Sequence, residues 1–395
     1  MAPSDTTSTV AGSSTGHAPV VLQVLPSLGG GGVERGTVEM TAALTEAGWT
    51  ALVVSSGGPM VRDIERAGGK HIQLPVHSKN FFVMRKNAKR IAAIVKEHGV
   101  DLIHARSRAP AWSAFWAAQQ TGTPFVTTVH GPYSLGLPFK RLYNSIMTRG
   151  DRVIATSEFI RGYILDNYKK VDPDHIRVIH RGVNIDIFDP GKTTPARVIH
   201  LATTWRIPDG VPVVMLPGRL TRWKGHQILF NALALLKDRP VRCLIVGDDQ
   251  GRTAYRRELD AMVTKLGLQS VVHIVGGCRD MAAAYKLSDV VVSASTEPEA
   301  FGRVVAEAQA IGKPVIAPDH GAAPEILIPG VTGWLVPPSD PKSLADALTT
   351  ALDLDTAARE RLAQAAIARV HDNFTTKKMC DATIAVYREL LDGTQ

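Results

Sequence analysis

Cysteine is scarce in this sequence of 395 residues, and long apolar runs are absent. Cys243, Cys278 and Cys380 lie far apart and form no CxxC spacing, so we expect neither a disulfide framework nor a zinc site, and a reducing compartment. No apolar run reaches the roughly 18 residues that a membrane-spanning helix needs. Residues 1–17 lack the basic and apolar regions of a signal peptide, which predicts a disordered tail on a cytoplasmic protein.

Acidic residues are outnumbered by basic ones, 37 against 45, which gives a formal net charge of +8. This balance favours an anionic partner: a nucleic acid, a phosphorylated ligand or an acidic membrane surface. The sequence contains no recognised nucleic-acid-binding module, so we do not expect the first of these. The length suits two domains better than a single core.

Short apolar strands alternate with helical patterns along the chain. The strands are expected at 19–26, 50–56, 71–75, 101–105, 124–130, 152–157, 211–219, 241–248, 271–277, 289–295, 313–319 and 333–337. Helices are expected between them, for example at 33–48 and 81–99, each ending at a glycine. The alternation predicts parallel strands joined by right-handed crossovers. The fold class is therefore α/β, with two Rossmann-like, doubly wound domains that face each other across a cleft.

Residues 176–197 interrupt the alternation with a segment rich in Gly, Asn, Asp and Pro, as expected of a domain linker. We therefore expect an N-terminal domain at 18–190 and a C-terminal domain at 191–376. A last helix at 377–395, capped by Thr375 or Thr376, is expected to cross back to the first domain.

Four consecutive glycines, Gly29 to Gly32, follow the first strand and open the first helix. Without side chains they can present backbone N–H groups to an anion at the helix N-terminus. A dinucleotide-binding loop is one alternative, but it needs an acidic residue at the end of the second strand, where Ser55 and Ser56 stand. A simple turn between strand and helix is the other alternative.

Arg219 and Lys224 follow the first strand of the second domain, beside Gly218 and Gly225. Arginine can bind a phosphate through two N–H groups and lysine adds a point charge, so this pair suits a diphosphate. Two solvated surface cations are the alternative interpretation.

The segment EPEAFGRVVAEAQAIG (297–312) carries Glu299 and Glu307, with a helix expected to begin near Phe301 and to end at Gly312. An anion at the start of this helix would have one carboxylate on each side. Carboxylates accept pairs of hydrogen bonds, which neighbouring sugar hydroxyls donate. The alternative is a helix-start charge at Glu299 and an exposed Glu307, although Glu307 lies in the largely apolar stretch VVAEAQA.

EPEAFGRVVAE resembles the E-x7-E motif of the retaining glycosyltransferases of family 4, which have the GT-B fold. Further segments resemble this family in the same order along the chain: GGGGVE, TTVHGPY, RGVNIDIFDP, PGRLTRWKG and HGAAPEILIPGVTGWLVPPSDPKSLADAL. The linker departs from the family at Arg181 to Asn184, where Asn-Gly-Val-Asp is frequent. We expect a hinge variation there, without loss of activity.

The resemblance implies a retaining, metal-independent enzyme that moves a hexose from a GDP- or UDP-linked sugar to a glycan or lipid-linked acceptor, in lipopolysaccharide or other cell-surface polysaccharide biosynthesis. The N-terminal domain would face the acceptor and the C-terminal domain would bind the donor. No cofactor or metal is expected, because Asp172-Pro173-Asp174 and Asp353-Leu354-Asp355 do not follow a hydrophobic strand as a metal-binding Asp-x-Asp would. The alternatives are another GT-B enzyme such as an epimerase, a non-catalytic sugar-nucleotide sensor and a nucleic-acid-binding protein.

The resemblance also implies roles for individual residues. Those implied in catalysis are His130 near the anomeric carbon, Arg219 and Lys224 on the diphosphate leaving group, and Glu299 on the donor sugar. Those added for donor binding are Gly31 and Gly32 on the diphosphate, Glu307 on the ribose, Ala300, Phe301 and Gly302 on the sugar, and Gly277 and Cys278 along the base.

Three basic residues at the end of another strand, His104, Arg106 and Arg108, are candidates for the acceptor side, with structural roles as the alternative. Residues 80–90 and 137–152 combine aromatic or aliphatic side chains with Lys and Arg. Such segments can lie on an anionic membrane surface. Amphipathic helices packed on the sheet are the alternative for both.

Overall fold

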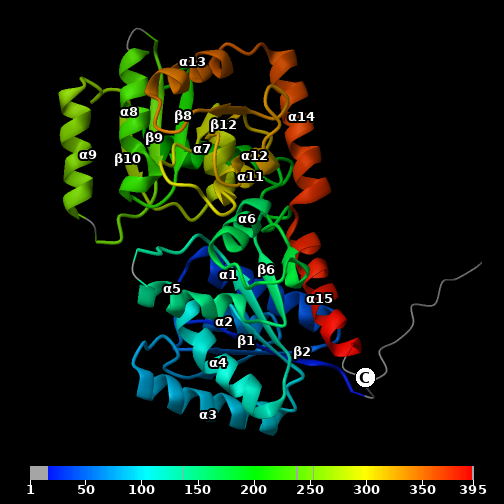
Figure 1. The fold of residues 1–395 in the computed structure, drawn as a ribbon. Coiled ribbons are helices and arrows are strands. Elements are labelled where there is room, and N and C mark those ends of the chain that lie inside the picture. The colour runs from blue at the N-terminus through cyan, green and yellow to red at the C-terminus, as the bar shows by residue number, and fades with distance from the viewer. Residues whose placement is uncertain (1–16, 137, 237–238, 252, 394–395) are drawn as a thin grey trace, which may run out of the picture. The chain divides into compact units, whose positions relative to one another are not determined.

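The structure, a computed structural model, describes residues 17–136, 138–236, 239–251 and 253–393, and the chain forms two compact units (Figure 1). Unit 1 comprises Met1–Ile154, Tyr168–Arg177 and Cys380–Gln395, and unit 2 comprises Ala155–Asn167 and Val178–Met379. Apart from His17, the expected tail at 1–17 lies outside the described residues. Unlike the expected domains, neither unit is one continuous stretch of sequence.

A seven-stranded sheet with the order β3-β2-β1-β4-β5-β6-β7 is carried mainly by unit 1. Its strands are β1 (Val20–Val24), β2 (Thr50–Ser55), β3 (Lys70–Gln73), β4 (Leu102–Ala105), β5 (Phe125–Val129), β6 (Arg152–Ala155) and β7 (Ile176–Val178). The helices between them are α1 (Gly32–Glu46), α2 (Val61–Arg66), α3 (Phe81–His98), α4 (Arg108–Thr121), α5 (Pro138–Asn144) and α6 (Glu158–Asn167). β1 pairs in parallel with both β2 and β4, so the sheet grows in both directions from β1 and is doubly wound.

Unit 2 contains a six-stranded sheet with the order β10-β9-β8-β11-β12-β13. Its strands are β8 (Val213–Pro217), β9 (Arg242–Val246), β10 (Val272–Gly276), β11 (Val290–Val292), β12 (Val315–Pro318) and β13 (Trp334–Val336). The helices are α7 (Pro195–Thr204), α8 (His226–Leu235), α9 (Thr253–Lys265), α10 (Met281–Leu287), α11 (Arg303–Ala310), α12 (Ala323–Ile326), α13 (Pro341–Leu352), α14 (Thr356–Asn373) and α15 (Thr376–Asp392), of which α15 continues into unit 1. The expected α/β fold with two parallel sheets is confirmed.

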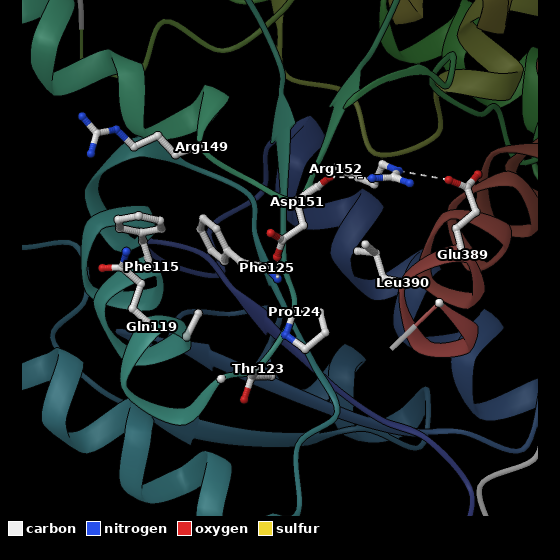
Figure 2. Close-up of a pocket in the computed structure, with 13 residues that line it drawn as sticks. Phe115, Gln119, Thr123, Pro124, Phe125, Arg149, Asp151, Arg152, Glu389 and Leu390 are labelled. Atoms are coloured by element: carbon white, nitrogen blue, oxygen red, sulfur yellow. Dashed lines mark hydrogen bonds and ion pairs between the residues drawn. The ribbon is translucent and has the colours of Figure 1, made fainter. Parts of the chain in front are cut away.

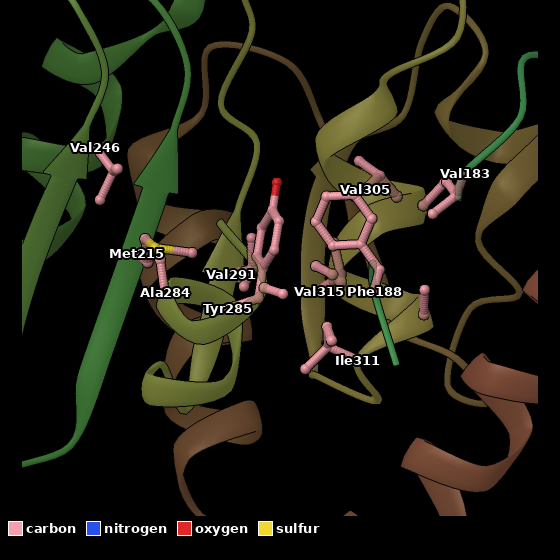
Figure 3. Close-up of a cluster of buried hydrophobic side chains, with 14 of the residues drawn as sticks. Val183, Phe188, Met215, Val246, Ala284, Tyr285, Val291, Val305, Ile311 and Val315 are labelled. Atoms are coloured by element: carbon pink, nitrogen blue, oxygen red, sulfur yellow. The ribbon is translucent and has the colours of Figure 1, made fainter. Parts of the chain in front are cut away.

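The strands of unit 2 bury side chains on both faces of their sheet. Alternate residues of a strand point to opposite faces, so Val213 and Met215 join one apolar cluster while Val214 and Leu216 join another. The first cluster includes residues of α10 and α11 (Figure 3), and the second includes residues of α8, α9 and α13. Burial on both faces explains why these strands read as continuous apolar runs in the sequence.

The expected linker at 176–197 contains some secondary structure. Strand β7 occupies its start, and helix α7 begins at Pro195. A strand of three residues gives too little periodicity to be recognised in a sequence. Within unit 2, Gly182 passes so close to the start of α15 that a Cβ atom would lie 2.4 Å from the Cα atom of Thr376. Glycine is therefore required at this point of the linker.

Asn184, where the family often has aspartate, folds the linker locally. Its Oδ1 atom accepts hydrogen bonds from the backbone N–H groups of Asp186 and Ile187 at 2.9 and 3.3 Å. An aspartate carboxylate can accept the same two bonds. The amide therefore serves this turn as well as the acid would.

The last helix, α15, is capped by Thr375, one of the two residues expected to do so. The Thr375 side-chain oxygen accepts a hydrogen bond from the backbone N–H of Lys378 at 3.1 Å. Further along α15, Tyr387 is fully buried in unit 1, where its hydroxyl lies 2.6 Å from Nδ1 of His104. The C-terminal segment thus supplies a core residue to the unit that begins the chain.

Candidate active site

The predicted site residues follow the carboxyl ends of parallel strands, where open α/β sheets bind their ligands. In unit 1, Gly31 and Gly32 come after β1 and His130 after β5. In unit 2, Arg219 comes after β8 and Glu299 after β11. Each group is described below within its own unit.

Lys224 and Glu299 form a largely enclosed ion pair in unit 2. The Nζ atom of Lys224 donates to Oε1 of Glu299 at 2.8 Å, and the two side chains are 11% and 18% exposed. The ammonium group also lies 4.5 Å from the centre of the Trp223 ring. The hydroxyl of Ser295 donates to the same carboxylate oxygen. These contacts hold both charged groups in one orientation.

The pKa of Glu299 lies below its usual value. Burial by itself raises this pKa, but the charge of Lys224 and the hydrogen bonds from Lys224, Ser295 and Ser293 together outweigh burial. Glu299 is therefore ionised at neutral pH, and its negative charge keeps the ammonium group of Lys224 in place.

Glycines allow the segment around Lys224 to approach the end of β11. Gly225 has a φ of 71°, and a Cβ atom on it would lie 1.7 Å from the backbone oxygen of Ala294. A Cβ atom on Gly247 would lie 1.7 Å from the backbone oxygen of Gly218. Only glycine permits such close approaches. The position of Lys224 is therefore built into the backbone.

Glu307 is buried in α11 and is only 7% exposed. Its Oε2 atom accepts a hydrogen bond from the hydroxyl of Tyr285 at 3.0 Å, and its Oε1 atom lies 3.4 Å from Nε of Arg303. The ring of Tyr285 belongs to the apolar cluster of unit 2, and its hydroxyl stands at the edge of that cluster (Figure 3). The alternative of an exposed Glu307 is therefore wrong.

Helix α11 begins at Arg303 instead of near Phe301, because Gly302 takes a left-handed conformation with a φ of 81° and acts as the N-cap. Phe301 is buried, with its ring centre 6.2 Å from that of His180 and 5.7 Å from that of Phe374. Together with half-buried Ala300, these residues make a tight turn between Glu299 and the helix. The sequence pattern continues smoothly from Phe301 into the helix and so hides this turn.

Three other predicted donor-binding residues of unit 2 stand beside strand ends. Arg219 is exposed, and its side chain makes no hydrogen bond or ion pair with any residue that the structure describes. Gly277 is exposed and Cys278 half-buried directly after β10. Burial raises the pKa of the free Cys278 thiol, which therefore stays protonated at neutral pH.

The glycine loop of unit 1 is exposed from Gly30 to Gly32, and none of these glycines takes a left-handed conformation. Gly31 is the N-cap of α1 with a φ of −87°, and Gly32 is the exposed first residue of that helix. A Cβ atom on Gly31 would lie 2.6 Å from Oε2 of Glu34, whereas nothing lies within 4 Å of one on Gly30. The Glu34 carboxylate therefore already lies beside this helix start, and anion binding by Gly31 and Gly32 stays a prediction.

His104 and Arg106 are enclosed within unit 1. Both nitrogens of His104 are hydrogen-bonded, Nδ1 with the Tyr387 hydroxyl at 2.6 Å and Nε2 with Oγ1 of Thr128 at 2.7 Å. Burial, and then the charge of Arg106, hold the pKa of His104 well below its usual value. Arg106 donates to Oε1 of Gln23 at 3.0 Å. These contacts favour the structural alternative for both residues.

Arg108 and His130 are less enclosed, and each is half-buried after its strand. Arg108 donates to Oδ1 of Asn144 at 2.9 Å, and its guanidinium lies 4.5 Å from the centre of the Tyr133 ring. Arg108 is therefore the one of the three acceptor-side candidates with an accessible charged group.

Sequence reasoning missed four residues that shape the site: Ser293, Ser295, Tyr285 and Arg303. Ser293 and Ser295 alternate at the end of β11, so their shared face was available as a signal. Arg303 stands one helical turn before Glu307, which is also visible in the sequence. Tyr285 belongs to a different helix, and only the fold brings it to Glu307.

A cavity of about 580 Å³ in unit 1 opens at the amino-terminal ends of β5 and β6 (Figure 2). Phe115 and Gln119 of α4 line it, together with Arg152 and Glu389, whose Nε and Oε2 atoms form an ion pair at 3.1 Å. None of the predicted catalytic or donor-binding residues lines this cavity. It stands at the strand ends opposite to those that carry the candidate site.

Among the described residues, no helix is long and apolar enough to cross a membrane. The two segments considered for membrane contact expose large apolar side chains, notably Phe82 (81% exposed) and Phe139 (84% exposed). Residue 137, at the start of the second segment, lies outside the described residues.

Two family models match the chain. Residues 30–187 match the family described as Glycosyltransferase Family 4, and residues 202–369 match the family described as Glycosyl transferases group 1. A D-inositol 3-phosphate glycosyltransferase of Xylanimonas cellulosilytica is 30% identical over 305 residues, which are 72% of this chain and 70% of that protein. The chain belongs to the glycosyltransferases of family 4, with the GT-B fold.

Solved structures agree with this assignment. A glycosyltransferase from Rickettsia africae is 40% identical and superposes with a TM-score of 0.89, covering 95% of this chain and 99% of that one. HepE of Anabaena, solved in complex with UDP-glucose, is 25% identical with a TM-score of 0.82, covering 94% of this chain and 99% of that one. The glycosyltransferase family and GT-B fold expected from the sequence are confirmed.

Proposed function

We propose that the chain is a retaining, metal-independent glycosyltransferase that binds its nucleotide-diphosphate sugar through unit 2. The observation that carries this proposal is the enclosed state of both glutamates of the E-x7-E motif. Glu299 is paired with Lys224, and Glu307 is held by Tyr285 and Arg303. Burial of a carboxylate is unfavourable for the free energy of folding, so buried carboxylates are typical of functional sites. Here they can accept hydrogen bonds from the hydroxyl groups of a sugar nucleotide.

Lys224 and Arg219 are the groups that would receive the leaving diphosphate. An ammonium group has three N–H donors, and Lys224 uses one of them on Glu299. Its position is already fixed, so it need not reorganise when negative charge develops on the departing phosphate. Arg219 is exposed beside the same strand end and adds a planar donor group.

Glu307 would hold the ribose and Glu299 the transferred sugar. The contacts of Glu307 with Tyr285 and Arg303 fix the orientation of its carboxylate, whose oxygens are the acceptors that a pair of ribose hydroxyls needs. The turn from Ala300 to Gly302 then lies beside the sugar, and Gly277 and Cys278 beside the base. In unit 1, Gly31 and Gly32 act on the diphosphate and His130 acts near the anomeric carbon, as the family resemblance implies.

The donor is proposed to be a UDP-linked hexose. The sequence leaves GDP and UDP open, and the likeness to HepE solved with UDP-glucose favours UDP. For the acceptor, a glycan or lipid-linked molecule remains our expectation, while the name of the Xylanimonas relative favours a phosphorylated polyol. The relatives do not support a role in lipopolysaccharide synthesis.

The proposal is tested by calorimetric titration of UDP and GDP, without metal and with EDTA, into wild type and Glu307→Ala. The exposed Glu360 of α14 provides a matched control, Glu360→Ala. We expect UDP to bind the wild type and the control equally, and the loss of the ribose contact to weaken binding by about tenfold or more. A folded protein that binds neither nucleotide would refute the proposed donor site.

Stereochemistry is tested separately, by NMR of UDP-glucose hydrolysis in the absence of acceptor. UDP-glucose carries an α-linked glucose, so retention predicts that α-glucose is the first product. First-formed β-glucose would show inversion.

A further inference from the structure

A second cavity in unit 1 lies at the strand ends that carry the candidate site. It has a volume of about 560 Å³. Its walls come from loops that follow β1, β4 and β5, from the segment before α3, and from α5. Of the three acceptor-side candidates, Arg108 lines it, and Lys140, Tyr143 and Asn144 come from the segment 137–152 considered for membrane contact.

The walls of this cavity carry positive charge and no negative charge. His77, Lys79, Arg108 and Lys140 line it, and none of the lining residues that the structure describes is Asp or Glu. Arg108 donates to the neutral amide of Asn144 and not to a carboxylate. The three permanent charges therefore face the cavity without compensation by its walls, which favours an anionic ligand.

Three hydroxyl-bearing residues, Ser107, Ser134 and Tyr143, also line this cavity. The hydroxyl oxygen of Tyr143 is buried and has no hydrogen-bond partner among the residues that the structure describes. Ser107 is the N-cap of α4, and its side chain makes no capping hydrogen bond. Hydroxyl-bearing residues in the wall suit a ligand with acceptor oxygens, because an unpaired donor is unfavourable.

We propose that this cavity binds a phosphate group of the acceptor, so that the enzyme glycosylates a phosphate-bearing molecule. The inference rests on the proposed transfer function and names the class of acceptor that this function serves. A phosphate has several acceptor oxygens and up to two negative charges, which match the guanidinium, ammonium and hydroxyl groups of the walls. A neutral glycan needs hydrogen-bond acceptors from the protein as well, and this cavity presents mainly donors.

The phosphate can belong to a water-borne ester or to a lipid headgroup. Phe139 stands next to Lys140, and Phe82 stands on the same segment as Lys79, with both rings exposed. Apolar side chains beside a basic cavity suit the surface of an anionic membrane. The experiment therefore has one arm for each source.

The first arm is a calorimetric titration of inorganic phosphate at constant ionic strength, with UDP present to occupy the donor site. The test variant is Lys79→Gln/Lys140→Gln, and the matched control is Lys96→Gln/Lys170→Gln, which removes two exposed charges elsewhere in unit 1. We expect phosphate binding to weaken about tenfold or more in the test variant and to stay within about twofold in the control. Tyr143→Phe should weaken it less than the double variant. Equal weakening in test and control, or no phosphate binding by folded wild type, would overturn the proposal.

The second arm measures sedimentation with phosphatidylglycerol vesicles, with phosphatidylcholine vesicles as the neutral comparison. Binding to phosphatidylglycerol that inorganic phosphate and the test variant both reduce assigns the cavity to a lipid-borne phosphate. Phosphate binding without vesicle binding assigns it to a water-borne ester. UDP binding is measured beforehand and depends on unit 2. Absence of UDP binding would refute the donor assignment, and the phosphate titration would still test the cavity of unit 1.

Discussion

The charge of Lys224 is balanced within unit 2 by a carboxylate that two serines also contact. Ser295 donates to Glu299, and Ser293 lies at 3.5 Å from the same oxygen. An enclosed ion pair of this kind adds little net stability over an apolar pair, but it is costly to break on one side only. Its value is therefore to hold Lys224 where a phosphate can reach it.

Replacing Lys224 by methionine should destabilise the fold, because Glu299 would keep its burial and lose its counter-charge. We expect a loss of about 3 kcal/mol in the free energy of unfolding, measured by urea denaturation. Lys224→Met/Glu299→Gln should recover most of this loss, since neither position of the pair then carries a buried charge. A double variant as unstable as the single one would show that packing, and not charge, sets the cost.

At the scale of elements, most strands and helices could be predicted because their signals are local. The apolar periodicity of residues 81–99 predicts helix α3, and its ends follow from two residues. Asn80 accepts hydrogen bonds from the backbone N–H groups of Phe82 and Val83, and Gly99 closes the helix with a φ of 60°. The sequence does not predict β7, which is too short, or the start of α11 at Arg303, which follows from the left-handed conformation of Gly302.

The same distinction applies to the candidate site. Glu307 could be predicted to be special because a carboxylate in an apolar helical stretch is unusual. Its partner Tyr285 could not, because it lies on another helix and carries no local signal. The basic cavity of unit 1 could not be predicted either, since five separate segments contribute to it.

The turn that carries Lys224 should tolerate no side chain at Gly225. Gly225→Ala should lower the free energy of unfolding by about 3 kcal/mol or more. The new Cβ atom would clash with the backbone oxygen of Ala294, and alanine would also have to adopt a left-handed conformation. Gly210 has a φ of 72° and nothing within 4 Å of a Cβ atom, so Gly210→Ala should cost only about 1 kcal/mol for the backbone conformation. Urea denaturation of both variants measures the difference, and equal losses would argue against a steric cause.

At the scale of the whole molecule, stability should fall on mild acidification. Burial, and then the charge of Lys224, lower the pKa of His226 from 6.5 to about 4. In the unfolded chain this histidine is protonated below about pH 6.5, whereas in the folded chain it is protonated only below about pH 4. The unfolded state therefore binds more protons between these two pH values, and the free energy of unfolding decreases as the pH falls from about 6.5 to about 4. Between pH 7 and pH 5 the contribution is about 2 kcal/mol.

Urea denaturation at pH 7 and pH 5 checks this expectation. His226→Gln should show a smaller difference between the two pH values than wild type does. His371→Gln, which changes an exposed histidine of α14, should retain the wild-type difference. If His226→Gln retained it too, other buried groups such as His104 would have to be responsible.

The division of the chain also bears on the order in which its parts can be completed during synthesis. Domains generally fold as they emerge, the N-terminal one first. Here the segment Cys380–Gln395 belongs to unit 1 but is made after every residue of unit 2. Until it leaves the ribosome, His104 has no Tyr387 to meet and unit 1 lacks part of its core. Unit 1 is therefore the first unit whose synthesis begins and the last whose synthesis is completed. In a nascent chain, unit 1 stays incomplete while unit 2 folds.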